Sequence, residues 1–349
     1  MRTKLFGLIL FLYLGSAFAA IAADQPAVMS ESNKTKADIP RYLPPHSKLV
    51  TDIIAAMPEK LSAVSKQPRK VLVIMGWESP LHDSGKAGLL VVLRTAAEKF
   101  HAFELTECYD CSDITGDMLK QYDAVVLNNT ANTYRKEVTA PFNACLEAYV
   151  KAGGGFFANH GSAHSGSPYP QILGIKGYGF PGNFAGLPFP VKVVEPDNPL
   201  MCAFCTPVKP TKFTFGYHDE SDNGHWKTMT KELQFPHEFA DELNTARLDM
   251  ADTANPIRVL LTLDMDILPK EMFSLKDKMT SSPLIWIRHY GKGKVFFSEF
   301  AHFGTTFTIP AITRSMLDGL QYVLGDLTVD EASGKSSNDS SSQGNNSGQ

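Results

Sequence analysis

A histidine flanked by small residues is the clearest candidate for chemistry in this sequence. His160 directly follows the apolar run 156–158 and precedes Gly161, Ser162 and Ala163. Such small neighbours allow a tight turn between a strand and a helix, from which the middle side chain projects into a cleft. An imidazole there can transfer protons or bind a metal ion near neutral pH. The alternative is a histidine that caps the next helix and has only a structural role.

Polar residues also follow other apolar runs that suit buried strands. Ligands of open α/β sheets bind beyond the carboxyl ends of the strands, so these residues are expected to form one site. His160 and His302 are the candidates for catalysis. The candidates for substrate binding are Trp77, His82, Asn129, Thr130 and Ser162.

A divalent metal ion is a candidate cofactor of the same site. His160 and His164 are four residues apart, and on an α-helix both imidazoles would face one ion. No glutamate follows His160 directly, so the pattern of helical metalloproteases is absent. The sequence leaves a site without metal as the alternative.

The elements that must position these residues alternate between strand and helix. Strands are predicted at 70–75, 102–107, 124–127, 156–158, 191–194, 257–263, 284–289 and 295–298. Helices are predicted at 85–99, 142–151 and 311–324. This alternation predicts an α/β fold with a mainly parallel sheet, right-handed crossovers and helices on both faces, in a single domain.

The two ends of the chain differ from its middle. Arg2 and Lys4 precede an apolar run, and small residues follow it, so residues 1–23 are predicted to be a signal peptide. The protein is therefore expected to be secreted or periplasmic, without a stable membrane span after cleavage; an uncleaved anchor is the alternative. Residues 24–68 are predicted to be a linker with a short helix. Residues 69–328 form the domain, with a loop-rich insertion at about 200–236, and residues 329–349 are expected to be disordered.

Composition excludes some partners. The 349 residues carry a formal net charge of -4 with scattered Lys and Arg, which argues against a nucleic-acid partner. Five cysteines include two Cys-x-x-Cys pairs, Cys108 with Cys111 and Cys202 with Cys205. Local disulfides are the first expectation in an oxidising compartment, free thiols the second and a four-thiolate zinc site the third.

Several blocks of the sequence resemble the ThuA-like (trehalose utilisation) family in their order and spacing. They are YDAVVLNNT, AYVKAGGGFFANHG, DELN, IRVLLTLDMD, WIRHYGKGKVFFSEFAHF and IPAITRSMLDGLQYVLGDL, within residues 69–327. The resemblance implies a flavodoxin-like three-layer fold, as in class I glutamine amidotransferases. In those amidotransferases a nucleophilic cysteine stands where this chain has His160, and a late histidine corresponds to His302. Because this chain lacks the cysteine, amidotransferase chemistry is excluded.

The family pattern also implicates His82 and the pair Asp241 and Glu242, and it adds both carboxylates to His160 and His302 as candidate catalytic residues. It implies an enzyme, a hydrolase, lyase or isomerase, that acts on a disaccharide or keto-sugar by acid–base chemistry between an imidazole and a carboxylate, with or without a metal ion. The chain departs from the pattern at Asn244, His164, 177–182 and Ala301, where relatives usually carry Tyr, Asp, an additional His and Gly. These departures favour the alternative, a non-catalytic sugar-binding module on an inherited enzyme fold.

Overall fold

The structure is a computed structural model. It describes residues 48–75, 82–109, 111, 114–130, 136–164, 169–179, 187–205, 211–215, 229–233, 238–276 and 279–330. The predicted signal peptide, and with it the basis for export, lies outside these residues, as does the predicted tail from residue 331 onward. Both expectations stay predictions. No helix within the described ranges is long and apolar enough to cross a membrane.

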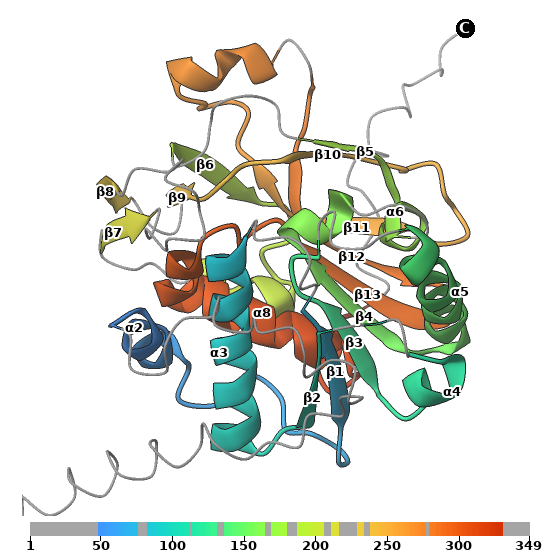
Figure 1. Cartoon of the computed structure of the whole chain (residues 1–349). Coiled ribbons are helices and arrows are strands. Elements are labelled where there is room, and N and C mark those ends of the chain that lie inside the picture. The colour runs from blue at the N-terminus through green and yellow to red at the C-terminus, as the bar shows by residue number, and fades with distance from the viewer. Residues whose placement is uncertain are drawn as a thin grey trace, which may run out of the picture.

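One nine-stranded sheet forms the centre of the fold (Figure 1). Its strands, in spatial order, are β2 (Glu104–Cys108), β1 (Lys70–Ile74), β3 (Ala124–Leu127), β4 (Gly155–Asn159), β13 (Gly293–Ser298), β12 (Pro283–Tyr290), β11 (Ile257–Leu263), β6 (Pro188–Val193) and β9 (Glu238–Ala240). The pairs from β2 to β13 are parallel. The pairs from β13 to β9 are antiparallel.

The α/β class predicted from the sequence is confirmed, and the sheet is mixed. The predicted parallel arrangement holds for five strands. Only a tight turn around Gly291, which has a φ of 60°, joins β12 to β13. Parallel neighbours need a crossover of a dozen or more residues, so a turn of this length enforces antiparallel pairing.

Helices cover both faces of the sheet (Figure 1). On one face lie α2 (Lys48–Ala56), α3 (Asp83–Phe100) and α8 (Pro310–Val323), and their apolar side chains share a core with alternate residues of β1. On the other face lie α4 (Gly116–Leu119), α5 (Lys136–Ala152) and α6 (Tyr169–Leu173). Since β1 buries successive side chains in opposite layers, its continuous apolar run is explained.

The short helix expected within the linker is α2, and it belongs to the packed domain. Its Leu49 and Ile53 are buried in the same core as α3 and α8. The predicted insertion at about 200–236 includes α7 (Cys202–Cys205) and a two-stranded ribbon of β7 (Thr211–Phe215) and β8 (Met229–Leu233). A second ribbon pairs β5 (Ile175–Gly179) with β10 (Thr245–Leu248).

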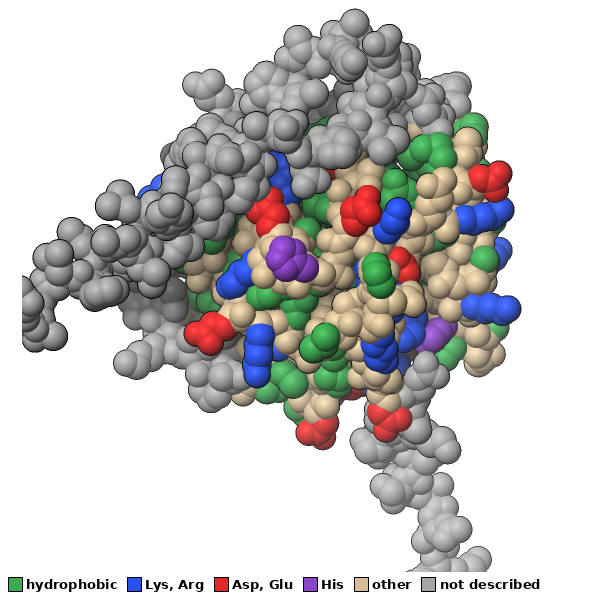
Figure 2. Space-filling view, turned by 90° about the horizontal axis from the view of Figure 1, so that it is seen from below, with side chains coloured by type: hydrophobic (Ala, Val, Ile, Leu, Met, Phe, Trp, Pro, Cys, Tyr) green, Lys and Arg blue, Asp and Glu red, His purple; other side chains and the backbone are tan. Residues whose placement is uncertain are grey.

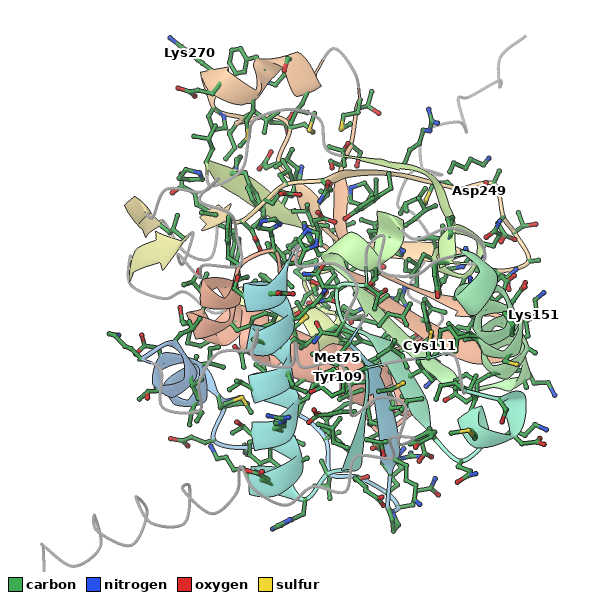
Figure 3. All side chains as sticks on the ribbon, in the orientation of Figure 1. Met75, Tyr109, Cys111, Lys151, Asp249 and Lys270 are labelled. Carbon is green, nitrogen blue, oxygen red and sulfur yellow. The ribbon has the colours of Figure 1, made fainter. Side chains whose placement is uncertain are left out.

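The expectation of local disulfides is wrong, because none of the five cysteines is joined to another in a disulfide. Cys108 ends a strand and is buried with Cys111 in the apolar layer under α5 and α6 (Figure 3). Cys202 and Cys205 are exposed at the two ends of α7, a single helical turn. One Cys-x-x-Cys pair is thus buried and the other exposed, and the described cysteines do not belong to any metal-binding group found in the structure.

Charged side chains of both signs share the face seen in Figure 2. Lys and Arg are interspersed with Asp and Glu over the described part of this face, and no basic stripe is formed there. A nucleic-acid-binding surface requires clustered positive charge. The expectation that the protein has no nucleic-acid partner stays a prediction.

Glycine allows the first turn of α3 to approach the loop that follows β13. A Cβ added at Gly85 would lie 1.9 Å from the carbonyl oxygen of Ala301 and 2.7 Å from that of His302. From the other side, a Cβ added at Gly304 would lie 2.5 Å from the carbonyl oxygen of Ser84. Helix and loop thus touch through their main chains, and any side chain at these positions would push them apart.

We predict that Gly85→Ala lowers the free energy of unfolding by about 3 kcal/mol, the upper end of the usual cost of overpacking, because the methyl group meets main-chain atoms that cannot rotate away. Denaturant unfolding measures this loss. Gly116→Ala is the matched control, since its Cβ would make only an ordinary 3.7 Å contact with the Cys145 Sγ atom. Equal stability of the two variants would contradict the close approach.

Candidate functional site

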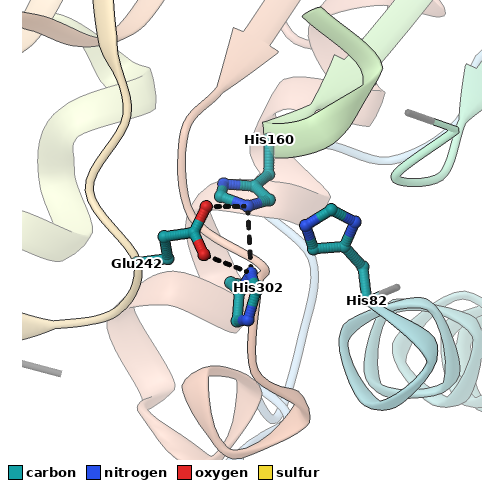
Figure 4. A group of neighbouring side chains, drawn as sticks. All are labelled: His82, His160, Glu242 and His302. Carbon is teal, nitrogen blue, oxygen red and sulfur yellow. Dashed lines mark hydrogen bonds and ion pairs between the residues drawn. The ribbon is translucent and has the colours of Figure 1, made fainter. Parts of the chain in front are cut away.

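Three imidazoles and one carboxylate converge at the carboxyl ends of the parallel strands (Figure 4). His82 precedes α3, His160 follows β4, Glu242 lies between β9 and β10, and His302 lies in the loop after β13. We call these four residues the four-residue centre. The nitrogen and oxygen atoms that they direct at one another all lie within 4.8 Å of one another.

Three of the side chains form a compact triangle. The His302 Nδ1 atom lies 3.3 Å from the His160 Nε2 atom and 3.1 Å from the Glu242 Oε2 atom. The His160 Nε2 atom lies 3.6 Å from the Glu242 Oε1 atom. The ring of His82 stands edge-on to both other imidazoles, with centroid distances of 5.0 Å to His160 and 4.7 Å to His302. All three histidines are buried, and the Glu242 side chain is 13% exposed.

The backbone is strained where it presents these groups. Positive φ angles occur at His82 (69°), Asn129 (56°), His160 (38°) and Ala301 (135°). Residues other than glycine rarely adopt such angles, and those that do cluster at functional sites, where the surrounding structure holds them. The strand-to-helix elbow expected at His160 thus has the backbone that such a turn requires. The conformation of Ala301 is one that favours glycine, the usual family residue there.

Buried amides hold the loops of the site together. The Asn129 Nδ2 atom donates to the Ala301 carbonyl at 2.8 Å, and the Asn129 Oδ1 atom accepts from the Gly161 N–H at 2.9 Å. The Ser162 hydroxyl donates to the Leu127 carbonyl and accepts from the backbone N–H of Thr130. Asn129, Thr130 and Ser162 were expected to bind substrate. Their buried side chains are hydrogen-bonded within the protein, where they position these loops, and their binding of substrate stays a prediction.

Asp241 also lies outside the four-residue centre, although it was expected to be catalytic. It is 1% exposed, and its carboxylate accepts hydrogen bonds from the backbone N–H groups of Glu242, Ala301 and Phe303 and from the Thr306 hydroxyl. Burial raises the pKa of Asp241 to about 6, against the opposing effects of the His160 charge and of these donors. The carboxylate anchors the loop that carries His302.

Glu299 was not predicted from the sequence. It contacts the ring nitrogen of His160 that faces away from the four-residue centre. The His160 Nδ1 atom lies 3.1 Å from the Glu299 Oε1 atom, which leaves the Nε2 atom to face the centre. The backbone N–H of Asn244 donates to Glu299 Oε1, and the single proton of the Tyr178 hydroxyl lies within reach of two acceptors, Glu299 Oε2 and the carbonyl oxygen of His160. Glu299 directly follows β13, and its position at the carboxyl end of a strand could have identified it as a site residue. Tyr178 lies on β5, and its position in the sequence did not indicate a role in the site.

The buried charges perturb one another. Burial alone would lower the pKa of His160, but the hydrogen bond and charge of Glu299 and the charges of Glu242 and Asp241 raise it to about 9. Burial and the neighbouring His160 hold the pKa of His302 well below its usual range. Burial raises the pKa of Glu242, although His160 opposes this. The site thus favours the charged form of His160 and the neutral form of His302.

Two further residues that were proposed from the sequence are Trp77, for substrate binding, and His164, for metal binding. Trp77 lies outside the described residues. His164 ends the 3-10 helix η4 (His160–His164), and its side chain also lies outside the described part. A 3-10 helix has three residues per turn, so the α-helical spacing assumed for His160 and His164 does not apply to this segment, and the metal pair stays a prediction. Among the residues that the structure describes, the group that could hold a metal ion is the four-residue centre.

A cavity of about 690 Å³ lies at the opposite ends of the parallel strands. Its lining includes Arg69, Asp123 and Tyr149 and no member of the four-residue centre. The Arg69 guanidinium is already paired with Asp123 and Asp326, so its charge is balanced within the protein. Ligands of α/β sheets bind at the carboxyl ends, and for this reason we do not assign the site to this cavity.

Comparison with known proteins gives the family. The family model for ThuA, described as trehalose utilisation, matches residues 70–323. The chain belongs to the ThuA family. Membership of this family implies a role in trehalose utilisation. The matched range also contains the four residues of the four-residue centre.

Solved structures similar to this ThuA-family chain are distant in sequence. A ThuA-like protein from Bacteroides uniformis is 14% identical, with a TM-score of 0.49, over 76% of this chain and 94% of that one. A cytoplasmic protein from Salmonella typhimurium is 15% identical, with a TM-score of 0.43, over 73% and 98%. A ThuA-like protein from Parabacteroides merdae is 16% identical, with a TM-score of 0.35, over 71% and 90%. No curated protein matches the chain.

We predict that Asp241→Asn lowers the free energy of unfolding of this ThuA-family chain by about 3 kcal/mol, since an amide nitrogen would face N–H and O–H donors that a carboxylate accepts. Denaturant unfolding at pH 8, where Asp241 is ionised, measures the loss. Asp117→Asn, at a side chain that is 91% exposed, serves as control and should be unchanged. A variant that keeps full stability but loses activity would return Asp241 to the catalytic residues.

Proposed function

We propose that the chain is a carbohydrate-processing enzyme that acts on a disaccharide or its keto derivative at the four-residue centre. The family supplies the coarse role in trehalose utilisation. The observation that carries the proposal is the convergence of His82, His160, His302 and Glu242 on one point. The four come from four separate segments of the chain and meet where α/β proteins bind ligands.

The four-residue centre is costly for the fold, and this cost supports a functional role. Burying ionisable groups is unfavourable unless they are fully compensated, and apolar side chains would fill the same volume more cheaply. Positive φ angles at His82 and His160 add strain on the order of 1–3 kcal/mol each. Buried ionisable groups and a strained backbone at one place are common in binding and catalytic sites, and a hydrophobic core has no use for either.

The chemistry of keto-sugars fits such a centre. Isomerisation and elimination next to a carbonyl, and hydrolysis that proceeds through elimination, begin with loss of the proton on the adjacent carbon and place negative charge on the carbonyl oxygen. Positively polarised groups fixed in advance around that oxygen stabilise the developing charge. The convergent imidazoles, or a cation held by them, would supply this stabilisation, with the sugar oxygen as their partner.

A sugar-binding module without turnover is the second candidate, and Asn244 is the observation that favours it. Where relatives usually have a tyrosine, the Asn244 amide lies 3.4 Å from the His160 Nδ1 atom and 3.3 Å from the Glu242 Oε1 atom. The amide fills the space between these groups but lacks the phenolic hydroxyl. A module of this kind would keep affinity for sugar without any reaction.

We predict that His160→Asn lowers turnover of disaccharides or their 3-keto derivatives by about 100- to 1,000-fold, the usual effect of removing one positioned polar group from the reacting oxygen. Asparagine tolerates the positive φ of this position, so the fold should persist. Product formation followed by NMR, with sugar binding measured alongside, tests this.

The matched control is His101→Asn, at an exposed left-handed residue that ends α3 far from the chemistry. It should keep full turnover. Sugar binding by the wild type without any turnover would support the binding module instead. Full turnover in His160→Asn would show that the reaction takes place elsewhere.

A further inference from the structure

We propose that the four-residue centre binds a divalent transition-metal ion, with His82, His160, His302 and Glu242 as its protein ligands. This differs from the pair expected from the sequence, His160 with His164, because three of these four ligands come from other segments of the chain. The inference rests on the proposed function for the chemistry that the ion would serve, but its test is binding of the metal itself.

The distances between the side chains fit a small cation. A tetrahedral ion with ligands at about 2.0–2.1 Å separates neighbouring ligand atoms by roughly 3.3–3.4 Å. The three short separations among His160, His302 and Glu242 are 3.1, 3.3 and 3.6 Å. These separations join four atoms, the His302 Nδ1, the His160 Nε2 and both carboxylate oxygens of Glu242, so one ion placed among them would contact both rings and the carboxylate. His82 approaches the same point from the position directly before α3, with its ring edge-on to the other two.

The ligand types select the class of metal. Imidazole nitrogens suit Zn²⁺, Fe²⁺, Co²⁺ and Ni²⁺, whereas Mg²⁺ and Ca²⁺ take oxygen ligands. The four-residue centre offers three nitrogens and one carboxylate. It therefore fits a borderline transition-metal ion, and Zn²⁺ is the natural probe.

The groups behind the ligands have the arrangement found around metal-bound histidines. A ligating histidine usually donates its second ring N–H to a carboxylate or a carbonyl, which fixes its tautomer and orientation. The His160 Nδ1 atom lies 3.1 Å from the Glu299 Oε1 atom and 3.0 Å from the Glu299 carbonyl oxygen. Glu299 is in turn held by Asn244 and Tyr178, so the Nε2 atom of His160 is directed at the centre.

The charges around the centre also call for a cation. Glu242 and Glu299 are both largely buried. Their ion pairs within the described residues are all with histidines, not with Lys or Arg. A divalent ion would balance the buried carboxylates. In the proposed reaction it would also act as a Lewis acid that polarises a sugar carbonyl.

The test is titration of the full-length, chelator-treated protein with Zn²⁺, followed by calorimetry and by elemental analysis after dialysis. One Zn²⁺ per chain is expected. His82→Asn, Glu242→Ala and His302→Asn should each weaken binding by at least about 100-fold, since each loses a direct ligand. Glu299→Gln should weaken it by only about 10- to 100-fold, the usual effect of removing a group behind a ligand.

Two controls guard against other sites and against unfolding. His101→Asn and Cys202→Ser should bind one Zn²⁺ with wild-type affinity; the second variant removes an exposed thiol that is itself a zinc ligand type. Circular dichroism and melting should show each ligand variant folded. Asparagine at residue 82 preserves the left-handed backbone there, so this variant is the most secure.

The outcomes separate the two proposals. Absence of stoichiometric Zn²⁺, Co²⁺, Fe²⁺ and Ni²⁺ binding, or undiminished binding by folded His82→Asn and His302→Asn variants, would overturn the metal site. Sugar turnover by a protein that binds none of these ions would overturn the metal site and leave the proposed function standing. Metal binding lost in the ligand variants, without turnover of any sugar, would establish the metal site and count against the proposed function.

Discussion

The parallel pairing of β4 with β13 is the constraint on which the site depends. Its register sets Asn159 opposite Ser298, so that the next residues, His160 and Glu299, leave the sheet side by side. The contact between the His160 ring and the Glu299 carboxylate then fixes the imidazole, and His302 follows three residues later. A slip of one residue in this pair would move one of the two side chains relative to the other and separate the imidazole from the carboxylate.

The remaining parts of the site are fitted to this pair by close contacts between main chains. Gly85 lets α3 approach the loop after β13, and His82 directly precedes this helix. Asp241 ties the segment before β10 to that loop, which brings Glu242 to the histidines. Asn129 joins the turns after β3 and β4 to the Ala301 carbonyl. The four-residue centre is thus a product of tertiary structure. The position of each member is fixed by contacts between its own loop and the loops that carry the other members.

Much of this could be predicted from local sequence patterns, and the rest could not for identifiable reasons. Apolar runs located β1, β3 and β4, and the rule about carboxyl ends then singled out His160 and His302 as neighbours. Glu242 was found only through the family resemblance, and its neighbour Asp241 was given the same role. The two carboxylates have different surroundings. Asp241 accepts hydrogen bonds from N–H groups of the loop, whereas Glu242 faces the histidines. Tyr178 lies on β5, whose pairing with β10 has no signature in either segment alone.

The central claim, that four side chains from distant segments meet around one cation, is tested most directly by X-ray diffraction. Crystals grown with Zn²⁺ would be measured at wavelengths on both sides of the zinc absorption edge. The account predicts one strong anomalous peak at about 2.0–2.2 Å from nitrogen atoms of His82, His160 and His302 and from an oxygen of Glu242. A peak elsewhere with none at this point, or side chains that point away from one another, would contradict it.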